Sequence, residues 1–456
     1  MSEAAALACP LLTDADTPLA RVGGRPVSRA AWLADVRELA ARLPEAPAAF
    51  NLCEDRYRFS VAFGAILLRG QMNLLPPARG RTVLGEIARG YPEAVALVDS
   101  CEEDFPLHTL AVSARGDAGG GNEDRPADIP MIPRDRTAIL GFSSGSTGTP
   151  TAHPRRWGDL VAVTKQALQR LKLDRTPGHT LVATVPPQHM YGLESTVLPA
   201  LLGPNTLLAE RPFYPADVHA ALERETRPVL ISTPFHLGTC LRSGQSAPSA
   251  PRRILSATAP LEASTAKELE AHFGAPVNEI YGCTEAGAIA SRRTVREHHW
   301  TPYPGVHVRA DGDASGLALA HGPQHREPVP LPDCIEVAED GRFRMTGRLA
   351  DMLNIAGKRA SLVELNRHLQ TLPGVEDGVF IPPADSSDAA GIARLAALVV
   401  APELSETDIL EQLAERLDPA FLPRPLVRVD NLPRSTTGKL PRQALLELLA
   451  SHGEPV

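Results

Sequence analysis

The chain has 456 residues, of which 43% are hydrophobic and 22% are charged, and its formal net charge is −8. These proportions are ordinary for a soluble globular protein, and the length allows a large domain and a smaller one. The acidic balance argues against a general nucleic-acid binder, whose surface is usually basic. No run of residues approaches the ~18 apolar residues of a membrane span.

The N-terminal sequence and the cysteines predict a cytoplasmic protein. Residues 1–16 lack the basic region that begins a signal peptide. The six cysteines are scattered and include no C-x-x-C pair. That spacing is typical of reduced thiols, not of a disulfide framework or a zinc site.

The first part of the chain alternates between helical and strand patterns. Ser28 and the apolar spacing after it predict a helix over residues 28–44. The apolar run 61–68 predicts a second, buried helix, and 94–98 predicts a strand. This alternation indicates α/β layers. The glycine- and charge-rich segment 114–128 is expected to be an exposed connection.

A loop rich in glycine, serine and threonine follows the apolar run 137–142, which predicts a buried strand. Glycines let backbone N–H groups turn toward one point and the hydroxyls add donors, so such a loop can hold phosphate oxygens. It is not a Walker A loop, and a flexible polar loop without phosphate is the alternative. The loop residues are Ser143, Ser144, Gly145, Ser146, Thr147 and Gly148.

Four predicted strands downstream, beyond a predicted helix at 160–171, each end in small, polar or aromatic residues. Ligands of open α/β sheets bind beyond the carboxyl ends of the strands. His189, in the first of these segments, is a candidate gate or substrate contact, although a lone histidine is more often packed or exposed. The strands and their following segments are 181–185 with 186–192, 228–232 with 233–236, 253–255 with 256–261, and 277–280 with 281–287.

The last of these segments carries the sharpest chemistry. Gly282 permits close backbone approach, Thr284 offers a hydroxyl, and Glu285 offers a hard oxygen ligand suited to Mg²⁺. Tyr281 presents a flat face on which a base could stack. The alternative is a helix start with Thr284 as its cap.

Together these motifs resemble the adenylate-forming superfamily, which includes acyl- and aryl-CoA synthetases, carrier-protein ligases, luciferases and the adenylation domains of peptide synthetases. The family's S/T-S/T-G-S/T-T-G-x-P-K phosphate loop is matched over residues 143–150, and its Y-G-x-T-E motif over 281–285. The small-residue segment before its adenine site resembles 256–261, and its P-x-x-H-x-x-G segment resembles 186–192.

The C-terminal third carries further features of the same family, in the same order. The resemblance implies that Asp333 binds the ribose hydroxyls and that Arg348, in a G-R-x-x-D run, contacts ribose or phosphate. Asp351, at the end of that run, resembles the family's hinge residue. Residues 432–440 resemble L-P-R-T-x-x-G-K, which implies that Lys439 is the catalytic lysine.

The resemblance also implies an α/β fold of two domains. Residues 1–350 would form a large N-terminal domain of layered α/β sheets with a small β-barrel-like part, and would bind AMP and the acyl group. Residues 351–456 would form a small, mobile α+β lid that carries the catalytic lysine.

The implied reaction uses ATP and Mg²⁺ in two steps. A carboxylate first attacks the α-phosphate of ATP, pyrophosphate leaves, and the acyl group then moves from AMP to a thiol. Glu285 is the implied magnesium ligand, Thr284 contacts the α-phosphate, and Lys439 stabilises developing charge. After the lid has swung, a loop with Gly357 and Lys358 would line the thiol tunnel.

The acid and the thiol acceptor are the least determined parts of this hypothesis. Small residues leave room for a flat ring or an alkyl chain. The resemblance to compact ligases that supply aryl starters to carrier proteins favours an aromatic acid such as a hydroxybenzoate or cinnamate, and a medium-chain fatty acid is the rival. We expect coenzyme A or a separate acyl carrier protein as acceptor, since no carrier domain follows the last predicted helix. The residues implied for the acyl pocket are His189, Phe235, Ala259, Gly282 and Cys283, with Ala257 and Tyr281 at the nucleotide.

One departure from the family pattern concerns the phosphate loop, in which Thr151 stands where the family has lysine. Nearby His153, Arg155 and Arg156 are candidates to supply the missing charge. A catalytically degraded nucleotide-binding protein therefore stays an alternative, although retention of Lys439 argues against it. A kinase-like enzyme is disfavoured because no Walker lysine is in the right frame.

Overall fold

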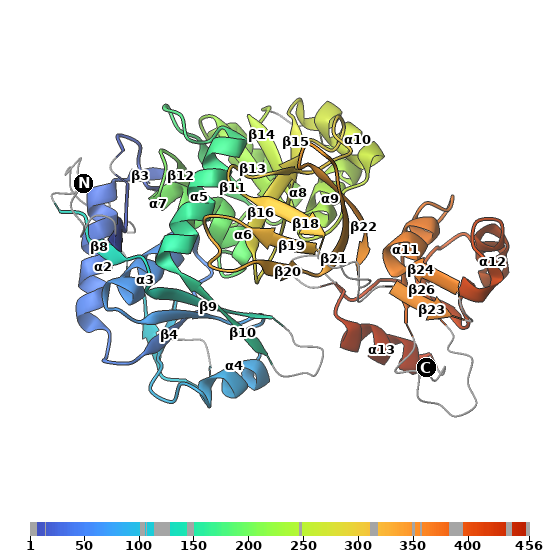
Figure 1. The fold of residues 1–456 in the computed structure, drawn as a ribbon, viewed down its shortest axis with the longest axis horizontal. Helices are drawn as coiled ribbons and strands as arrows, with labels where there is room; N and C mark the ends of the chain where they lie inside the picture. The colour runs from blue at the N-terminus through green and yellow to red at the C-terminus, as the bar shows by residue number, and fades with distance from the viewer. Residues whose placement is uncertain are drawn as a thin grey trace. The chain divides into compact units, whose positions relative to one another are not determined.

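The protein is described here by a computed structural model (Figure 1), over residues 7–13, 15–100, 105, 107–113, 128–143, 150–245, 249–310, 318–348, 352–355, 358–382, 395–434 and 440–452. The chain divides into two compact units. The first consists of Met1–Val308, Ala320–Val329 and Asp340–Arg342, and the second of Arg309–Leu319, Pro330–Glu339 and Phe343–Val456. The domain boundary at 350/351 stays a prediction.

The largest sheet in the described residues has nine strands, in the order β17-β16-β15-β14-β13-β11-β12-β2-β3. Its central strands β15 (Val277–Cys283), β14 (Arg253–Ser256), β13 (Pro228–Ser232) and β11 (Thr180–Ala183) are parallel neighbours. They are the four strands that the sequence predicted, so the segments that follow them lie along one edge of the sheet. The others are β12 (Thr206–Leu208), β2 (Ala20–Val22), β3 (Arg25–Val27), β16 (Gly287–Arg292) and β17 (Thr301–Pro302).

A second sheet, of six described strands, ends at the predicted phosphate loop. Its order is β10-β9-β5-β4-β6-β7. The predicted apolar strand is β9 (Thr137–Ser143), and β10 (Thr151–Arg156) returns antiparallel to it with Thr151 opposite Ser143. The loop is thus the connection of a β-hairpin, and its residues 144–149 lie outside the described residues. The inner strands are β5 (Met72–Leu75), β4 (Ala48–Asn51), β6 (Ala96–Val98) and β7 (Thr109–Ala111).

Helices form where the sequence carries caps and apolar faces. In α2 (Arg29–Arg42), the Ser28 hydroxyl accepts a hydrogen bond from Ala31 N at 3.1 Å, and the helix buries Trp32. The predicted helices at 61–68 and 160–171 are confirmed as α3 (Arg56–Leu68) and α5 (Trp157–Leu171), both with earlier starts. The first unit also contains α4 (Arg81–Ala88), α6 (Met190–Gly192), the π-helix η2 (Leu193–Val197), α7 (Leu198–Leu201), α8 (Pro215–Arg224), α9 (Pro234–Arg242) and α10 (Ala263–Phe273).

The second unit is built around a small sheet of β25 (Asp377–Ile381), β26 (Ala396–Val400) and β27 (Leu426–Arg428). Its helices are α11 (Leu362–Gln370), α12 (Glu406–Ala414), the 3₁₀ helix η3 (Pro419–Phe421) and α13 (Arg442–Ser451). The described residues also form shorter sheets. Two-stranded sheets pair β1 (Ala8–Pro10) with β8 (Met131–Pro133), β21 (Asp333–Val337) with β22 (Phe343–Arg348), and β23 (Met352–Ile355) with β24 (Lys358–Ser361). A three-stranded sheet has the order β18 (His307–Ala310), β19 (Ala318–His321), β20 (Val329–Leu331).

The predicted fold class, a large α/β part and a small α+β part, is confirmed. No helix among the residues that the structure describes has the length and hydrophobicity to cross a membrane. The predicted exposed connection at 114–128 falls almost entirely outside the described residues.

One buried arginine ties α3 to the nine-stranded sheet. Arg56 is 0% exposed and donates hydrogen bonds of 2.8–3.1 Å to the carbonyls of Leu208, Glu210, Ala183 and Val185. These carbonyls lie at the ends of β11 and β12, so the arginine anchors the start of the 186–192 segment.

We expect Arg56→Leu to lower the free energy of unfolding by about 3–5 kcal/mol, because four buried carbonyls lose their donor. Urea denaturation followed by circular dichroism measures this loss. Arg69→Leu, at the exposed end of the same helix, is the matched control and should change it by less than about 0.5 kcal/mol. Equal losses in both variants would contradict the anchoring role.

Candidate active site

The turn between β15 and β16 carries the Y-G-x-T-E motif. The two strands are antiparallel, with Gly282 opposite Ala288 and Cys283 opposite Gly287. A Cβ on Gly282 would lie 2.2 Å from the Gly287 carbonyl oxygen, and Gly287 itself has φ +71°. Both glycines are therefore required by the backbone. The alternative of a helix start at Thr284 is wrong, because a strand follows the turn.

The predicted phosphate strand reaches this turn. A Cβ added to Gly141, near the end of β9, would lie 3.5 Å from Thr284 Cγ2 and 3.8 Å from Met190 Sδ. Three segments far apart in sequence thus meet at one place: the strand leading into the phosphate loop, the Thr284 turn, and the residue after His189.

A histidine stands beside the predicted magnesium ligand. His153 Nε2 lies 3.6 Å from Glu285 Oε1, with the two side chains 16% and 43% exposed. His153 is two residues beyond Thr151 on β10. Of the candidates for the missing lysine charge, His153 is the one that this structure brings to Glu285.

Arg155 has a different role from the one proposed on sequence. Its side chain is buried, and Nη1 donates to the Thr284 carbonyl oxygen at 3.4 Å. Nη2 lies 3.9 Å from Glu194 Oε1. A Cβ on Gly287 would lie 2.8 Å from both side chains, so the pair lies directly against the turn.

Glu194 and Tyr303 are buried polar residues beside β16 that sequence reasoning did not single out, and Tyr303 N donates to the Ile289 carbonyl oxygen at 2.8 Å. Glu194 is buried on η2, and its Oε2 accepts a hydrogen bond from Ala288 N at 2.9 Å. Burial raises the pKa of the Glu194 carboxyl, and Arg155 opposes that shift. The available signal was a single charged residue, Glu194, in a run without any other charge (residues 193–202). Tyr303 carried no comparable signal.

The ring of Tyr281, the predicted adenine-stacking residue, packs against a second aromatic ring. The Tyr281 ring lies 5.5 Å from the Trp300 ring. The Arg292 guanidinium in turn lies over the Trp300 ring, 4.6 Å from its centroid. Glu279 binds Arg292 at 2.7 Å and also accepts a hydrogen bond from Leu261 N at 2.9 Å. Leu261 ends the 256–261 segment, so Glu279 couples the two segments predicted to flank the adenine.

The acyl-pocket candidates follow neighbouring strands at this edge of the sheet. His189 caps α6 and is half-buried, and Phe235 on α9 is 39% exposed with its ring 5.6 Å from that of His236. Ala257 is buried, whereas Ala259 is exposed. Burial and the Glu285 charge raise the pKa of Cys283 to about 12, so it is a neutral thiol at physiological pH.

The second unit holds the other predicted site residues. Asp333 is buried, and its backbone lies opposite that of Arg348 in the register of β21 and β22. Lys358 begins β24. In the first unit, Ser143 is the last residue of β9. Asp351, Gly357 and Lys439 lie outside the described residues, as does the segment 144–148.

The residues present fit a magnesium ion that arrives with a nucleotide. Among the described residues no group of three or more His, Cys, Asp or Glu side chains could hold a metal ion by itself. Mg²⁺ is typically bound through one or two carboxylates together with substrate phosphates and water. A single half-exposed Glu285 beside the Thr284 hydroxyl matches that donor set.

A protein-family comparison decides the class. The model described as "AMP-binding enzyme" matches residues 83–312, about half of the chain. The chain belongs to this family of AMP-binding enzymes. The resemblance to the adenylate-forming superfamily, predicted from the motifs, is confirmed.

Relatives with curated names are more distant. The 4-coumarate–CoA ligase of Rhodobacter capsulatus is 31% identical over 250 residues, which are 54% of this chain and 61% of that relative. The 4-chlorobenzoate–CoA ligase of an Arthrobacter species is 24% identical over 418 residues, which are 82% of this chain and 77% of the relative. This chain thus matches somewhat less than two thirds of the first relative's length.

Solved structures confirm the fold over the whole chain. The o-succinylbenzoate CoA synthetase of Bacillus subtilis, in complex with its acyl-adenylate, superposes with a TM-score of 0.80 at 19% identity. The alignment covers 96% of this AMP-binding enzyme and 98% of that chain.

We expect Gly282→Ala to abolish acid-dependent ATP–pyrophosphate exchange. Its Cβ would meet the Gly287 carbonyl at 2.2 Å, so the β15–β16 turn must open and carry Thr284 and Glu285 with it. The exchange assay measures the loss. Gly85→Ala, whose Cβ meets nothing within 4 Å, is the control and should keep full activity. An active Gly282→Ala enzyme would contradict this geometry.

Proposed function

We propose that this chain is an ATP-dependent, AMP-forming acid–thiol ligase. It activates a carboxylic acid as an acyl-adenylate and then transfers the acyl group to a thiol. The observation that carries the proposal is the convergence of Gly141, Thr284 and Met190 at one end of the parallel strands, with Glu285 and His153 beside them.

In the first step the enzyme needs positioning and charge stabilisation more than a base. A carboxylate is ionised at pH 7 and already a nucleophile, so holding it in line with the α-phosphate supplies much of the rate. Thr284 contacts the α-phosphate, while the 143–148 loop holds the leaving pyrophosphate. Bound at Glu285, Mg²⁺ would neutralise phosphate charge.

The residues that we propose for the nucleoside are those of the family's motifs. Tyr281 stacks on adenine, with Ala257 and its neighbours as the opposite wall. Asp333 accepts both ribose hydroxyls and Arg348 contacts ribose or phosphate. Tyr281 is supported by its packing on Trp300, and the Asp333–Arg348 register keeps those two residues on one ribbon.

Lys439 acts in the first half-reaction, and the lid rotates before the second. Residues 351–456 form the lid, Asp351 is its hinge, and Lys439 stabilises the charge that develops during adenylation. After rotation, Gly357 and Lys358 line the path of the thiol. We place the reaction in the cytoplasm, in keeping with the scattered cysteines.

The substrate that we favour is an aromatic acid, bound near His189, Phe235, Ala259, Gly282 and Cys283. The support comes from the names of three similar proteins, whose acids are 4-coumarate, 4-chlorobenzoate and o-succinylbenzoate. All three names also specify coenzyme A, which favours it as the acceptor over a carrier protein. A medium-chain fatty acid is the rival substrate.

The test is ATP–pyrophosphate exchange with Mg²⁺, in the absence of any thiol, across a panel of aromatic and aliphatic acids. We expect exchange with at least one aromatic acid, because adenylation is reversible before the thiol arrives. A folded protein that binds ATP but exchanges with no acid would contradict the proposal and support a binding-only protein, the alternative that Thr151 raises.

We expect Lys439→Ala to abolish exchange but largely to spare transfer from a supplied acyl-adenylate to coenzyme A, because the lysine acts in the first step alone. Each half-reaction is measured separately. Arg442→Ala, at an exposed position of α13, is the control and should leave both intact. Equal loss of both half-reactions in Lys439→Ala would contradict the swinging lid.

A further inference from the structure

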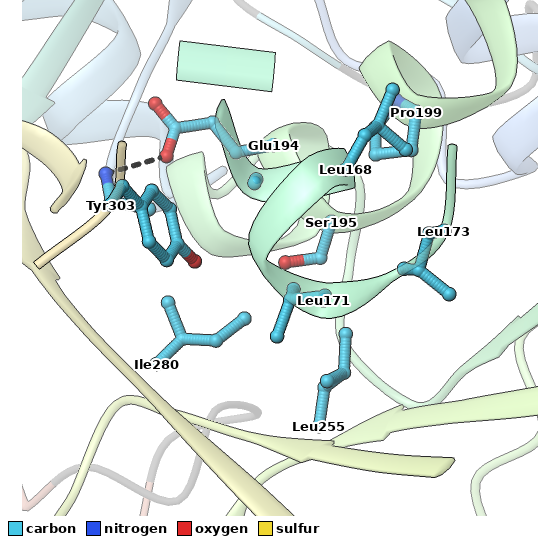
Figure 2. Close-up of a pocket in the computed structure, with 11 residues that line it drawn as sticks. Leu168, Leu171, Leu173, Glu194, Ser195, Pro199, Leu255, Ile280 and Tyr303 are labelled. Atoms are coloured by element: carbon cyan, nitrogen blue, oxygen red, sulfur yellow. Dashed lines mark hydrogen bonds between the residues drawn. The ribbon is translucent and has the colours of Figure 1, made fainter. Parts of the chain in front are cut away.

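The turn between β15 and β16 is held at its two ends by hydrogen bonds to distant side chains. At one end, Arg155 Nη1 donates to the Thr284 carbonyl oxygen at 3.4 Å. At the other, Glu194 Oε2 accepts from Ala288 N at 2.9 Å, the dashed line in Figure 2. Neither hydrogen bond involves the peptide groups in the middle of the turn, which follow Glu285, the proposed magnesium ligand.

Packing is incomplete on one side of this turn. A cavity of about 20 Å³ borders β16 there, lined by Ala288, Glu194 and Tyr303 among other residues (Figure 2). The atoms that line a void lose packing contacts on that side. The conformation of the turn therefore depends strongly on its hydrogen bonds.

The middle of the turn also has conformational freedom of its own. Gly287 has φ +71°. A Cβ there would lie 2.8 Å from both Arg155 Nη2 and Glu194 Oε1, so the space admits only glycine. Glycine populates positive and negative φ about equally. The backbone by itself therefore does not fix the orientation of the peptide group between Ala286 and Gly287, one residue beyond Glu285.

His325 fixes the orientation of this peptide group. Its Nε2 lies 2.8 Å from the Ala286 carbonyl oxygen, and since a carbonyl only accepts, the imidazole is the donor. Ala286 is 0% exposed, so its carbonyl oxygen lies away from water. A flipped peptide would leave a buried carbonyl without this donor, which is costly. The hydrogen bond therefore selects one of the orientations that Gly287 allows.

His325 is presented by a short turn of its own. Its backbone N–H donates to the Gly322 carbonyl oxygen at 2.8 Å, just after β19 ends at His321. This segment belongs to the same compact unit as β15 and β16. Burial and the nearby Arg155 lower the pKa of His325, so its imidazole is neutral at physiological pH and carries its single proton on Nε2.

We infer that His325 is a positioning residue for adenylation. It fixes the peptide between Ala286 and Gly287, and thereby holds Thr284 and Glu285 in the orientation that binds the α-phosphate and magnesium. The inference rests on the proposed function, because it assigns His325 to the site that MgATP would occupy. His325 acts through the turn and need not touch the nucleotide.

The experiment compares His325→Phe, which keeps a ring without a donor, with His325→Gln, whose amide places an N–H about where Nε2 lies. Calorimetric titration of the whole chain gives the Kd for MgATP, and pyrophosphate exchange gives the KM for the best acid of the panel. We expect His325→Phe to raise the Kd about 10-fold, as for one lost hydrogen bond to a buried group, and to keep the KM for the acid within about 2-fold. His325→Gln should stay within about 3-fold of the wild type in both.

Hydrogen exchange of the enzyme without ligands reports on the turn itself. Mass spectrometry should show faster exchange in peptides that cover residues 283–288 of His325→Phe, and unchanged exchange in peptides that cover the buried helix α3. His321→Phe is the matched control, because it makes the same substitution at an exposed histidine of the same segment. It should leave the Kd and the exchange of the turn at their wild-type values.

Each outcome decides the inference. An unchanged Kd in His325→Phe, or an equal loss of affinity in His325→Phe and His325→Gln, would overturn it. A parallel rise in the KM for the acid would assign His325 to general support of the fold and would also overturn it. A wild-type enzyme that binds MgATP but exchanges with no acid would refute the proposed ligase, while the Kd comparison would still decide the role of His325. A wild-type chain that binds no MgATP would refute both.

Discussion

The site depends on one buried cation. Arg155, on the strand that leaves the phosphate loop, binds the carbonyl of Thr284 and lies beside the carboxylate of Glu194. These three residues come from the three segments that build the site. A buried guanidinium must keep such partners, because an unpaired buried charge is strongly unfavourable. Arg155 therefore fixes the positions of the β9–β10 hairpin, the Thr284 turn and the π-helix η2 relative to one another.

The parallel sheet supplies the second constraint. Because β11, β13, β14 and β15 run in the same direction, the segments after them lie along one edge, where polar side chains can face a shared ligand. Two braces then stiffen this edge. Arg56 holds the end of β11 through carbonyls, and Glu279 couples Leu261 to the Arg292–Trp300–Tyr281 stack. Arg56 and Glu279 thus position the segments that carry the candidate site residues.

The departure from the family's phosphate loop has a local consequence. With Thr151 in place of lysine, the imidazole of His153 lies 3.6 Å from the Glu285 carboxylate. Arg155, on β10 of the same hairpin, is buried instead, where it contacts the Thr284 turn and lies beside Glu194.

Local apolar patterns and short ordered motifs in the sequence predicted the family, the α/β class and the four central strands of the largest sheet, because each of these depends on residues that are near one another in the chain. It also predicted α2, α3 and α5, with errors of up to five residues at their ends. Only the tertiary structure decided that Thr284 begins a return strand and not a helix, that Arg155 is buried and His153 faces Glu285, and that Glu194 and Tyr303 share a cavity. Each of these depends on contacts between residues distant in the chain, such as the 94 positions that separate Glu194 from Ala288, and periodicity within one segment carries no information about such contacts.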